Sequence, residues 1–130
     1  MRRWTASLLA VVALLGADGC SSSQEPAART TAAAFQRAVA EQDTGAACAL
    51  LSDAARDQLV AATRRECPQA LAALGLSGDD VRSTEVWGRQ AQARLGSGVL
   101  FLAELRDGWR VTAAGCTPRP DQPYACPVQA

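Results

Sequence analysis

The sequence of 130 residues contains no histidine and no lysine. Histidine is the commonest general base, the base in Ser-His and Cys-His pairs, and a frequent zinc ligand, so its absence excludes those arrangements. All 13 basic residues are arginines, and 13 acidic residues balance them. A chain without an excess of positive charge lacks the basic stripe that binds phosphate backbones, which argues against nucleic acid as a partner.

The chain also lacks an apolar run of the roughly 20 residues that a permanent membrane-spanning helix needs. Its longest apolar stretch, Trp4 to Gly16, follows the pair Arg2-Arg3 and precedes small residues. This order of charged, apolar and small residues is typical of a secretory signal peptide. We therefore expect residues 1–19 to be a signal peptide for general secretion, and the arginine pair leaves the twin-arginine route open as the alternative.

The junction at residues 17–20, Ala-Asp-Gly-Cys, resembles a bacterial lipobox, in which the cysteine receives a diacylglyceryl group and becomes the mature N-terminus. The usual pattern has Leu where this chain has Ala17, and a small neutral residue where it has Asp18. The alternative is ordinary cleavage after Gly19, which would leave Cys20 as a free thiol. We expect Cys20 to be lipidated and to anchor the protein on the extracytoplasmic face of the cell membrane.

The number of cysteines agrees with such an anchor. A secreted protein normally pairs its thiols because its compartment is oxidising. The chain has five cysteines, and a lipid on Cys20 leaves an even set of four: Cys48, Cys67, Cys116 and Cys126. None of the four forms a C-x-x-C pair, so we expect two disulfides rather than an all-thiolate metal site or a redox centre, with no metal and no cofactor.

Helix signals dominate the first half of the mature chain. Residues 20–28, which include Pro26, are expected to form the lipidated cysteine and a short polar tether, and residues 29–130 a single small domain. Capping residues and apolar spacing predict four helices. The first starts at Thr30 or Thr31 and runs to Gln42, and the others start at Asp43, at Ser52 or Asp53, and at Cys67-Pro68 before a stop at Gly75.

The second half reads as strands. Short runs over 81–87, 89–95, 99–105 and 109–114 are separated by turns that contain glycine. Val99 to Ala103 is apolar on both faces, which predicts a central strand covered on both sides. Helices followed by an antiparallel meander indicate the α+β class.

The order of these elements also predicts how the four cysteines pair. Four cysteines allow three connectivities. Cys48 lies in the second predicted helix and Cys67 starts the fourth, so a helical layer that folds back brings them together. Cys116 ends the last predicted strand, and the proline-rich segment TPRPDQPY is expected to be a loop that returns Cys126 to it. We therefore expect the pairs Cys48–Cys67 and Cys116–Cys126.

Three stretches carry a family resemblance. FQRAVAEQDTGAACALL at 35–51, DGWRVTAAGC at 107–116 and PYAC at 123–126 resemble small secreted actinobacterial lipoproteins of uncharacterised role. Those are similar to the nuclear transport factor two-like (cystatin-like) superfamily. The resemblance covers about residues 29–126. It implies N-terminal helices packed into the concave face of a curved, cone-like antiparallel sheet, and it implies no particular reaction.

The superfamily includes steroid isomerases and dehydratases, which place Asp, Tyr or His groups inside the cone. No position of this chain matches their catalytic motifs, and its only tyrosine is Tyr124. The strand carboxylates Glu85 and Glu104 are the candidates for a general base, because burial would raise the pKa of either one. The alternative is that each faces solvent or pairs with an arginine such as Arg94 or Arg110.

Two functions follow as hypotheses. Trp87, Phe101 and Trp109 either line a small apolar pocket or belong to the core. The first hypothesis is a non-catalytic, membrane-tethered binding or interaction module of the cell envelope, whose partner is an envelope protein or a small apolar ligand. The second is a small pocket enzyme of the isomerase or dehydratase kind. A cavity holding one glutamate beside Trp109 would favour the enzyme, and an interior filled by Phe35, Leu59 and Phe101 would favour the module.

Overall fold

The computed structural model describes residues 21–130, and within this range it leaves undescribed the side chains of residues 21–23 and 122. The expected signal peptide and the expected lipid site at Cys20 lie outside the described residues. Within the described part, none of the helices combines the length and the apolar character that crossing a membrane would require.

Four helices come first, and local capping marks the starts of the second and third and the end of the fourth. Their bounds are α1 Ser21–Ala40, α2 Thr44–Leu50, α3 Asp53–Thr63 and α4 Cys67–Leu74. The Asp43 carboxylate accepts a hydrogen bond from the Ala46 N–H, and the Ser52 hydroxyl accepts one from the Ala55 N–H, each at 3.1 Å. Gly75, with φ +61°, ends α4 in the left-handed conformation. These boundaries confirm the predicted ones.

The start of α1 differs from the prediction. The helix begins at Ser21 rather than at Thr30 or Thr31, so the segment expected to be a polar tether is helical from Ser21 onward. Thr30 does not cap the helix, because its hydroxyl donates to the Pro26 carbonyl one turn earlier, at 2.8 Å. Ala28 and Ala32 are fully buried, so the apolar stripe of α1 extends below Thr30 and its packing prolongs the helix.

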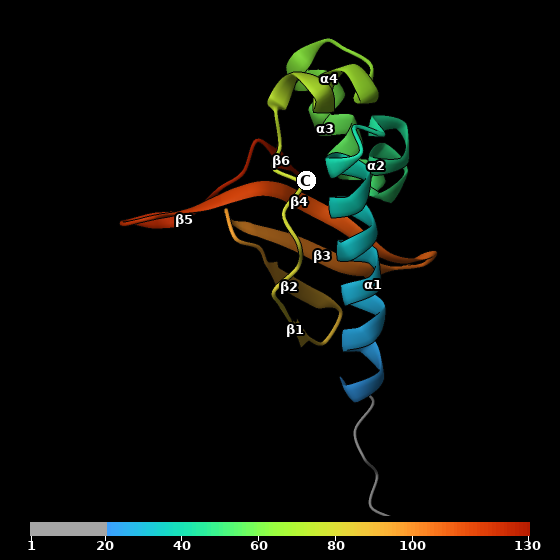
Figure 1. Cartoon of the computed structure of the whole chain (residues 1–130), viewed down its shortest axis with the longest axis vertical. Helices are drawn as coiled ribbons and strands as arrows, with labels where there is room; N and C mark the ends of the chain where they lie inside the picture. Colours follow the sequence, from blue (N-terminus) through green and yellow to red (C-terminus); the bar gives the residue numbers. More distant parts are fainter. Residues whose placement is uncertain (1–20) are drawn as a thin grey trace, which may run out of the picture.

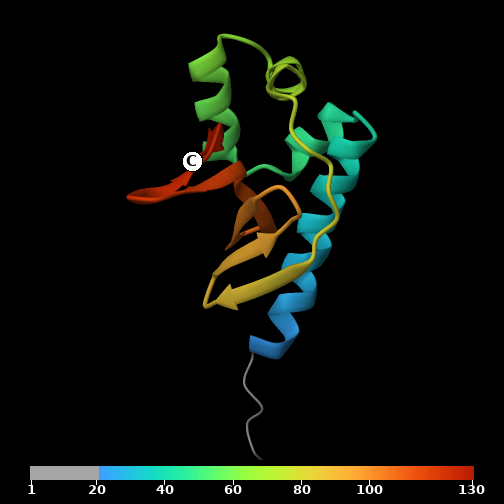
Figure 2. The same cartoon turned by 60° about the vertical axis from the view of Figure 1, so that its left-hand side comes forward.

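The strands form one antiparallel sheet in the order β1-β2-β3-β4-β5, and β6 also pairs with β4. Their bounds are β1 Ser83–Trp87, β2 Gln90–Arg94, β3 Val99–Leu105, β4 Gly108–Arg119, β5 Gln122–Ala125 and β6 Val128–Gln129. Figures 1 and 2 show α1 running along the sheet from the β1 edge, with α2, α3 and α4 gathered beyond β4. The domain therefore belongs to the α+β class.

The C-terminal segment corrects a second expectation. The residues expected to form a proline-rich loop instead form a hairpin, because β4 continues to Arg119 and β5 pairs with it. The pairs are Thr117 with Ala125 and Arg119 with Gln122, so Pro118 and Pro123 fall between paired positions. Their missing N–H groups therefore break few ladder bonds. Strand β6 then pairs with residues 113 and 114 of β4.

The core lies on both faces of the central strand β3, as predicted. Leu100 and Leu102 face the helices and share a cluster with Phe35, Leu51 and Leu59. On the opposite face a second cluster forms from Val99, Ala113 and Cys116, and Phe101, Tyr124 and Cys126 pack against it. The rings of Phe101 and Tyr124 meet edge to face with their centroids 5.2 Å apart.

Both predicted disulfides are present. Cys48–Cys67 joins α2 to the first residue of α4, and Cys116–Cys126 joins β4 to the residue after β5. Cys116 lies within β4 rather than at its end. One bridge thus connects two short helices, and the other holds the C-terminal hairpin to the sheet.

Candidate functional site

The five candidate pocket residues lie on two faces of the sheet. Trp109 is 6% exposed in the helix-side core, and its cross-strand partner is Glu104. On the opposite face Glu85 pairs across β1 and β2 with Gln92, which in turn pairs with Phe101. The two candidate glutamates are therefore separated by the sheet, and they cannot act on one substrate together.

The three aromatic candidates also have different surroundings. Trp109 belongs to the helix-side cluster, and Phe101 packs in the cluster on the other face. Trp87, the last residue of β1, is 56% exposed. None of the five candidates lines either of the two hollows described below. The structure does not bring the five residues together as one site.

A hollow of about 550 Å³ opens at the helical end of the molecule. We call it the helical groove. Its walls come from the end of α1, from α2 and α4, and from the segment that follows α4. The lining residues carry no charge and are mostly apolar: Val39, Ala40, Gln42, Thr44, Ala47, Leu71, Ala72, Gly75, Leu76 and Gly78.

Two turns in the chain create this groove. Gln42 adopts a left-handed conformation with φ +59°, and the chain then turns through Asp43 into α2. On the other wall Gly78 lies directly against α1, where a Cβ atom at residue 78 would come within 2.6 Å of the Ala40 Cα. Only glycine allows this close approach.

Hydrogen bonds hold the segment after α4 in place. The amide Nε2 of Gln36, a residue only 4% exposed, donates to the carbonyls of Ser77 and Asp79 at 3.0 and 2.7 Å. Hydrogen bonds from the Ser97 and Ser77 side chains lower the pKa of Asp79, and the charge of Arg82 lowers it further. This segment separates the helical groove from a smaller hollow of about 230 Å³ that Phe35 and Gln36 help to line. The groove therefore has a fixed wall.

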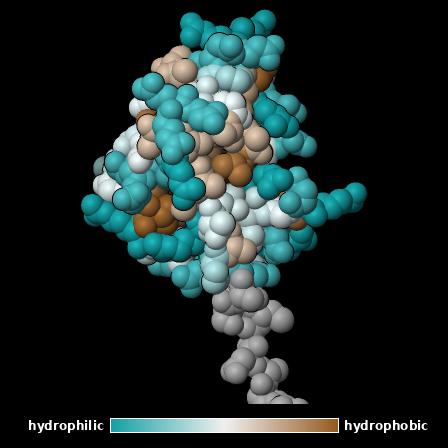
Figure 3. All heavy atoms as spheres, turned by 45° about the vertical axis from the view of Figure 1, so that its right-hand side comes forward, coloured by the Kyte–Doolittle hydropathy of each residue, from teal (hydrophilic) through white to brown (hydrophobic). Residues whose placement is uncertain are grey.

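The helical groove offers few polar side chains to a ligand. Its volume is within the range of small-molecule sites, and its side-chain polar groups are the Gln42 amide and the Thr44 hydroxyl. Neither group titrates near neutral pH, so neither supplies general acid or base catalysis. In Figure 3 the most hydrophobic residues on the pictured face form small patches among hydrophilic residues.

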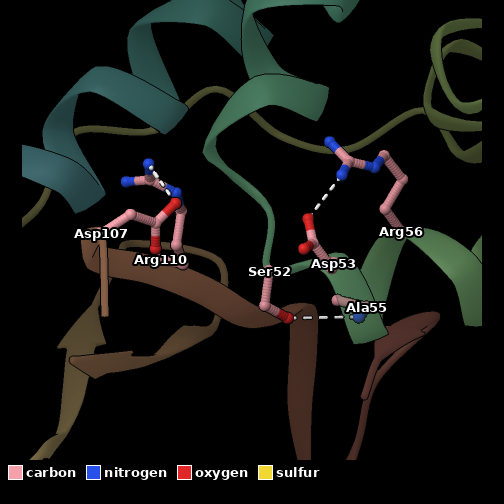
Figure 4. A network of polar contacts seen from close by, with 6 residues as sticks. All are labelled: Ser52, Asp53, Ala55, Arg56, Asp107 and Arg110. Atoms are coloured by element: carbon pink, nitrogen blue, oxygen red, sulfur yellow. Dashed lines mark hydrogen bonds and ion pairs between the residues drawn. The ribbon is translucent and has the colours of Figure 1, made fainter. Parts of the chain in front are cut away.

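Two ion pairs near the helices each join residues that are close in the sequence. Asp53 pairs with Arg56 at 2.5 Å, and Asp107 pairs with Arg110 at 2.9 Å, each between residues three apart (Figure 4). Arg110 is therefore bound by Asp107 rather than by Glu104. Among the described side chains, no group of three or more histidine, cysteine or acidic residues is placed to hold a metal ion.

The helical groove was not predictable from the sequence patterns. Its residues come from four segments of the chain, and half of them are alanine or leucine at positions that look like ordinary core. The available signals were two glycines within four residues after a helix and the helix break at residues 42–43. These signals indicate turns, but they do not indicate that the turns leave a hollow.

Comparison with protein-family models, with curated proteins and with solved structures finds no match to this chain. Its function therefore has to be inferred from its own residues.

Proposed function

We propose that this protein is an extracytoplasmic lipoprotein, tethered to the cell membrane through Cys20, that serves as a non-catalytic binding or interaction module of the cell envelope. The observation that carries the proposal is the pairing of the other four cysteines. Two disulfides are typical of an oxidising compartment, and they leave Cys20 as the one cysteine that needs another role. The lipobox-like junction supplies that role.

The start of α1 supports a location close to the membrane. The helix begins at Ser21, immediately after the cysteine expected to carry the lipid. A helical connection rises only about 1.5 Å per residue, so it places the domain nearer to the anchor than an extended tether would.

Two features favour binding over catalysis. Glu85 and Glu104 lie on opposite faces of the sheet, and the helical groove is lined by uncharged residues. An uncharged hollow favours a small ligand that is itself uncharged, since burying a charge there without a partner would be costly. The arrangement of helices against an antiparallel sheet agrees with the superfamily resemblance, which stays a prediction.

Replacing Cys20 by alanine tests the anchor. We expect the mature variant to move from the membrane fraction to the soluble fraction, because the acyl chains provide most of the binding energy. Immunoblots of fractionated cells measure this shift. Ser22→Ala, two residues along, is the matched control and should stay with the membrane. A Cys20→Ala protein that remains with the membrane as fully as wild type would contradict the anchor.

Filling the groove tests the binding role. Ala72 lines the groove and is exposed, so phenylalanine at this position would obstruct part of the groove while leaving the core intact. Ala73→Phe is the control, because residue 73 is also exposed on α4 but does not line the groove. We expect native mass spectrometry of protein purified from its own membrane to show an uncharged small molecule on wild type and Ala73→Phe, and none on Ala72→Phe. Wild-type protein without any ligand, or equal occupancy in all three proteins, would contradict the groove as the binding site.

A further inference from the structure

Trp87 is the most exposed large hydrophobic side chain among the described residues, at 56%, compared with 38% for Val60 and for Leu105. It ends β1 and precedes a two-residue turn formed by Gly88, with φ +58°, and Arg89. A single exposed tryptophan has no meaning by itself. Its place relative to the anchored end of the chain gives it one.

The start of β1 lies beside the N-terminal half of α1, and Trp87 lies at the other end of the strand. The guanidinium of Arg29 donates to the carbonyl of Val81, two residues before β1, at 3.1 Å. Figures 1 and 2 both show β1 as the strand nearest to the end of α1 where the helix begins. Eight residues separate Ser21 from Arg29, which corresponds to about 12 Å along the helix axis.

Cys20 is the residue directly before α1. The inference drawn from this position rests on the proposed lipid anchor at Cys20. Acyl chains on Cys20 would place the first turn of α1 at the bilayer surface. The headgroup region adds about 5–7 Å to each side of the hydrocarbon core. We propose that a tilt of α1 brings Trp87 into this headgroup region, so that the membrane that holds the anchor also binds the β1–β2 hairpin.

The side chains at the hairpin suit this environment. A tryptophan ring combines a large apolar surface with an N–H donor, and tryptophan is enriched at membrane–water interfaces for that reason. Arg89 is exposed and forms no ion pair with another described side chain, so it is available to a lipid phosphate. Glu85 is exposed on the same strand and face as Trp87. Its negative charge would be repelled by an anionic membrane surface. The tryptophan ring, not charge, therefore drives the contact, and the contact depends little on salt.

Tryptophan fluorescence tests the proposal. Beyond the expected signal peptide the chain has only two tryptophans, Trp87 and the buried Trp109, so Trp109→Phe leaves Trp87 as the single reporter. The lipidated variant is placed in phosphatidylcholine vesicles with or without bromine on the acyl chains close to the headgroups. We expect brominated lipid to lower the Trp87 emission roughly twofold and the emission maximum to shift to the blue.

A control reporter is placed away from the anchored end. Val60, on α3, becomes tryptophan in a chain that also carries Trp87→Phe and Trp109→Phe, and this reporter should not be quenched. If Trp109→Phe unfolds the domain, the wild-type protein labelled with 5-fluorotryptophan is used instead, and its fluorine NMR signals are measured. A paramagnetic lipid should then broaden the fluorine signal of Trp87 and spare that of Trp109.

The outcomes separate this inference from the proposed function. Protein that carries lipid and floats with the vesicles, but whose Trp87 is unquenched or is quenched no more than the residue-60 reporter, overturns the hairpin contact and leaves the anchor intact. Protein from the membrane-free fraction that carries no lipid contradicts the proposed function, and the hairpin contact with it.

Discussion

Replacing both Cys48 and Cys67 by alanine is expected to lower the free energy of unfolding by about 3 kcal/mol. The bridge spans 19 residues, and removing it restores that loop's freedom in the unfolded chain. The two helices it joins have only seven and eight residues, too few to be stable alone. Guanidinium unfolding under oxidising conditions measures the loss.

The second disulfide provides the comparison. Cys116–Cys126 spans 10 residues, so the chain-entropy model predicts a slightly smaller loss, somewhat under 3 kcal/mol, for its double alanine variant. Only the Cys48/Cys67 variant should also loosen the helical groove, since α2 and α4 form two of its walls. Hydrogen exchange in α2 and α4 distinguishes the two variants. Wild-type stability in the Cys48/Cys67 variant would show that packing alone holds these helices.

Phe35→Ala is expected to cost about 3–5 kcal/mol, the range found for removing a buried aromatic ring. Phe35 is fully buried on α1, within the cluster that also contains Leu51, Leu59, Leu100 and Leu102. A small domain is stable by about 5–15 kcal/mol in total, so this single change removes a large part of its stability. Urea unfolding followed by far-ultraviolet circular dichroism measures the change.

Phe101→Ala is the matched control for this substitution. Phe101 is only partly buried, in the smaller cluster on the other face of the sheet, so its loss should cost clearly less than that of Phe35. Phe35→Leu, which keeps most of the apolar volume, should also cost less. If the Phe101 variant lost as much stability as the Phe35 variant, the docking of α1 on the sheet would not be the main source of stability.

The features that could be predicted from the sequence are those set by nearby residues. Asp43 and Ser52 cap helices through hydrogen bonds to residues three positions ahead, and Gly75 ends a helix through its own backbone conformation. Such signals act within one helical turn, so they can be read without knowing the fold. The start of α1 could not be predicted in this way, because it depends on the packing of Ala28 against residues that are distant in the sequence.

The C-terminal hairpin was missed for a similar reason. Three prolines between Cys116 and Cys126 argue against a strand, and only the register with β5 shows that Pro118 and Pro123 fall between paired positions. The disulfide pairing was nevertheless predicted, because it needs only that each half of the chain folds back on itself. It does not need the exact elements.

The candidate site shows where sequence patterns stop being informative. Alternation along a strand assigns side chains to two faces, but it does not say which face the helices cover, so Glu85 and Glu104 could not be separated in advance. A hollow such as the helical groove depends on which volume the side chains leave unfilled. That volume follows from the angles between α1, α2 and α4, which no local motif encodes.

The most direct test of the proposed function is the intact mass of the protein extracted from its own membrane. A lipoprotein should give a chain that begins at Cys20, lacks residues 1–19, carries a diacylglyceryl adduct on that cysteine, and retains both disulfides. A soluble mature chain with an unmodified Cys20 thiol, recovered from wild-type cells as the main form, would contradict the lipid anchor.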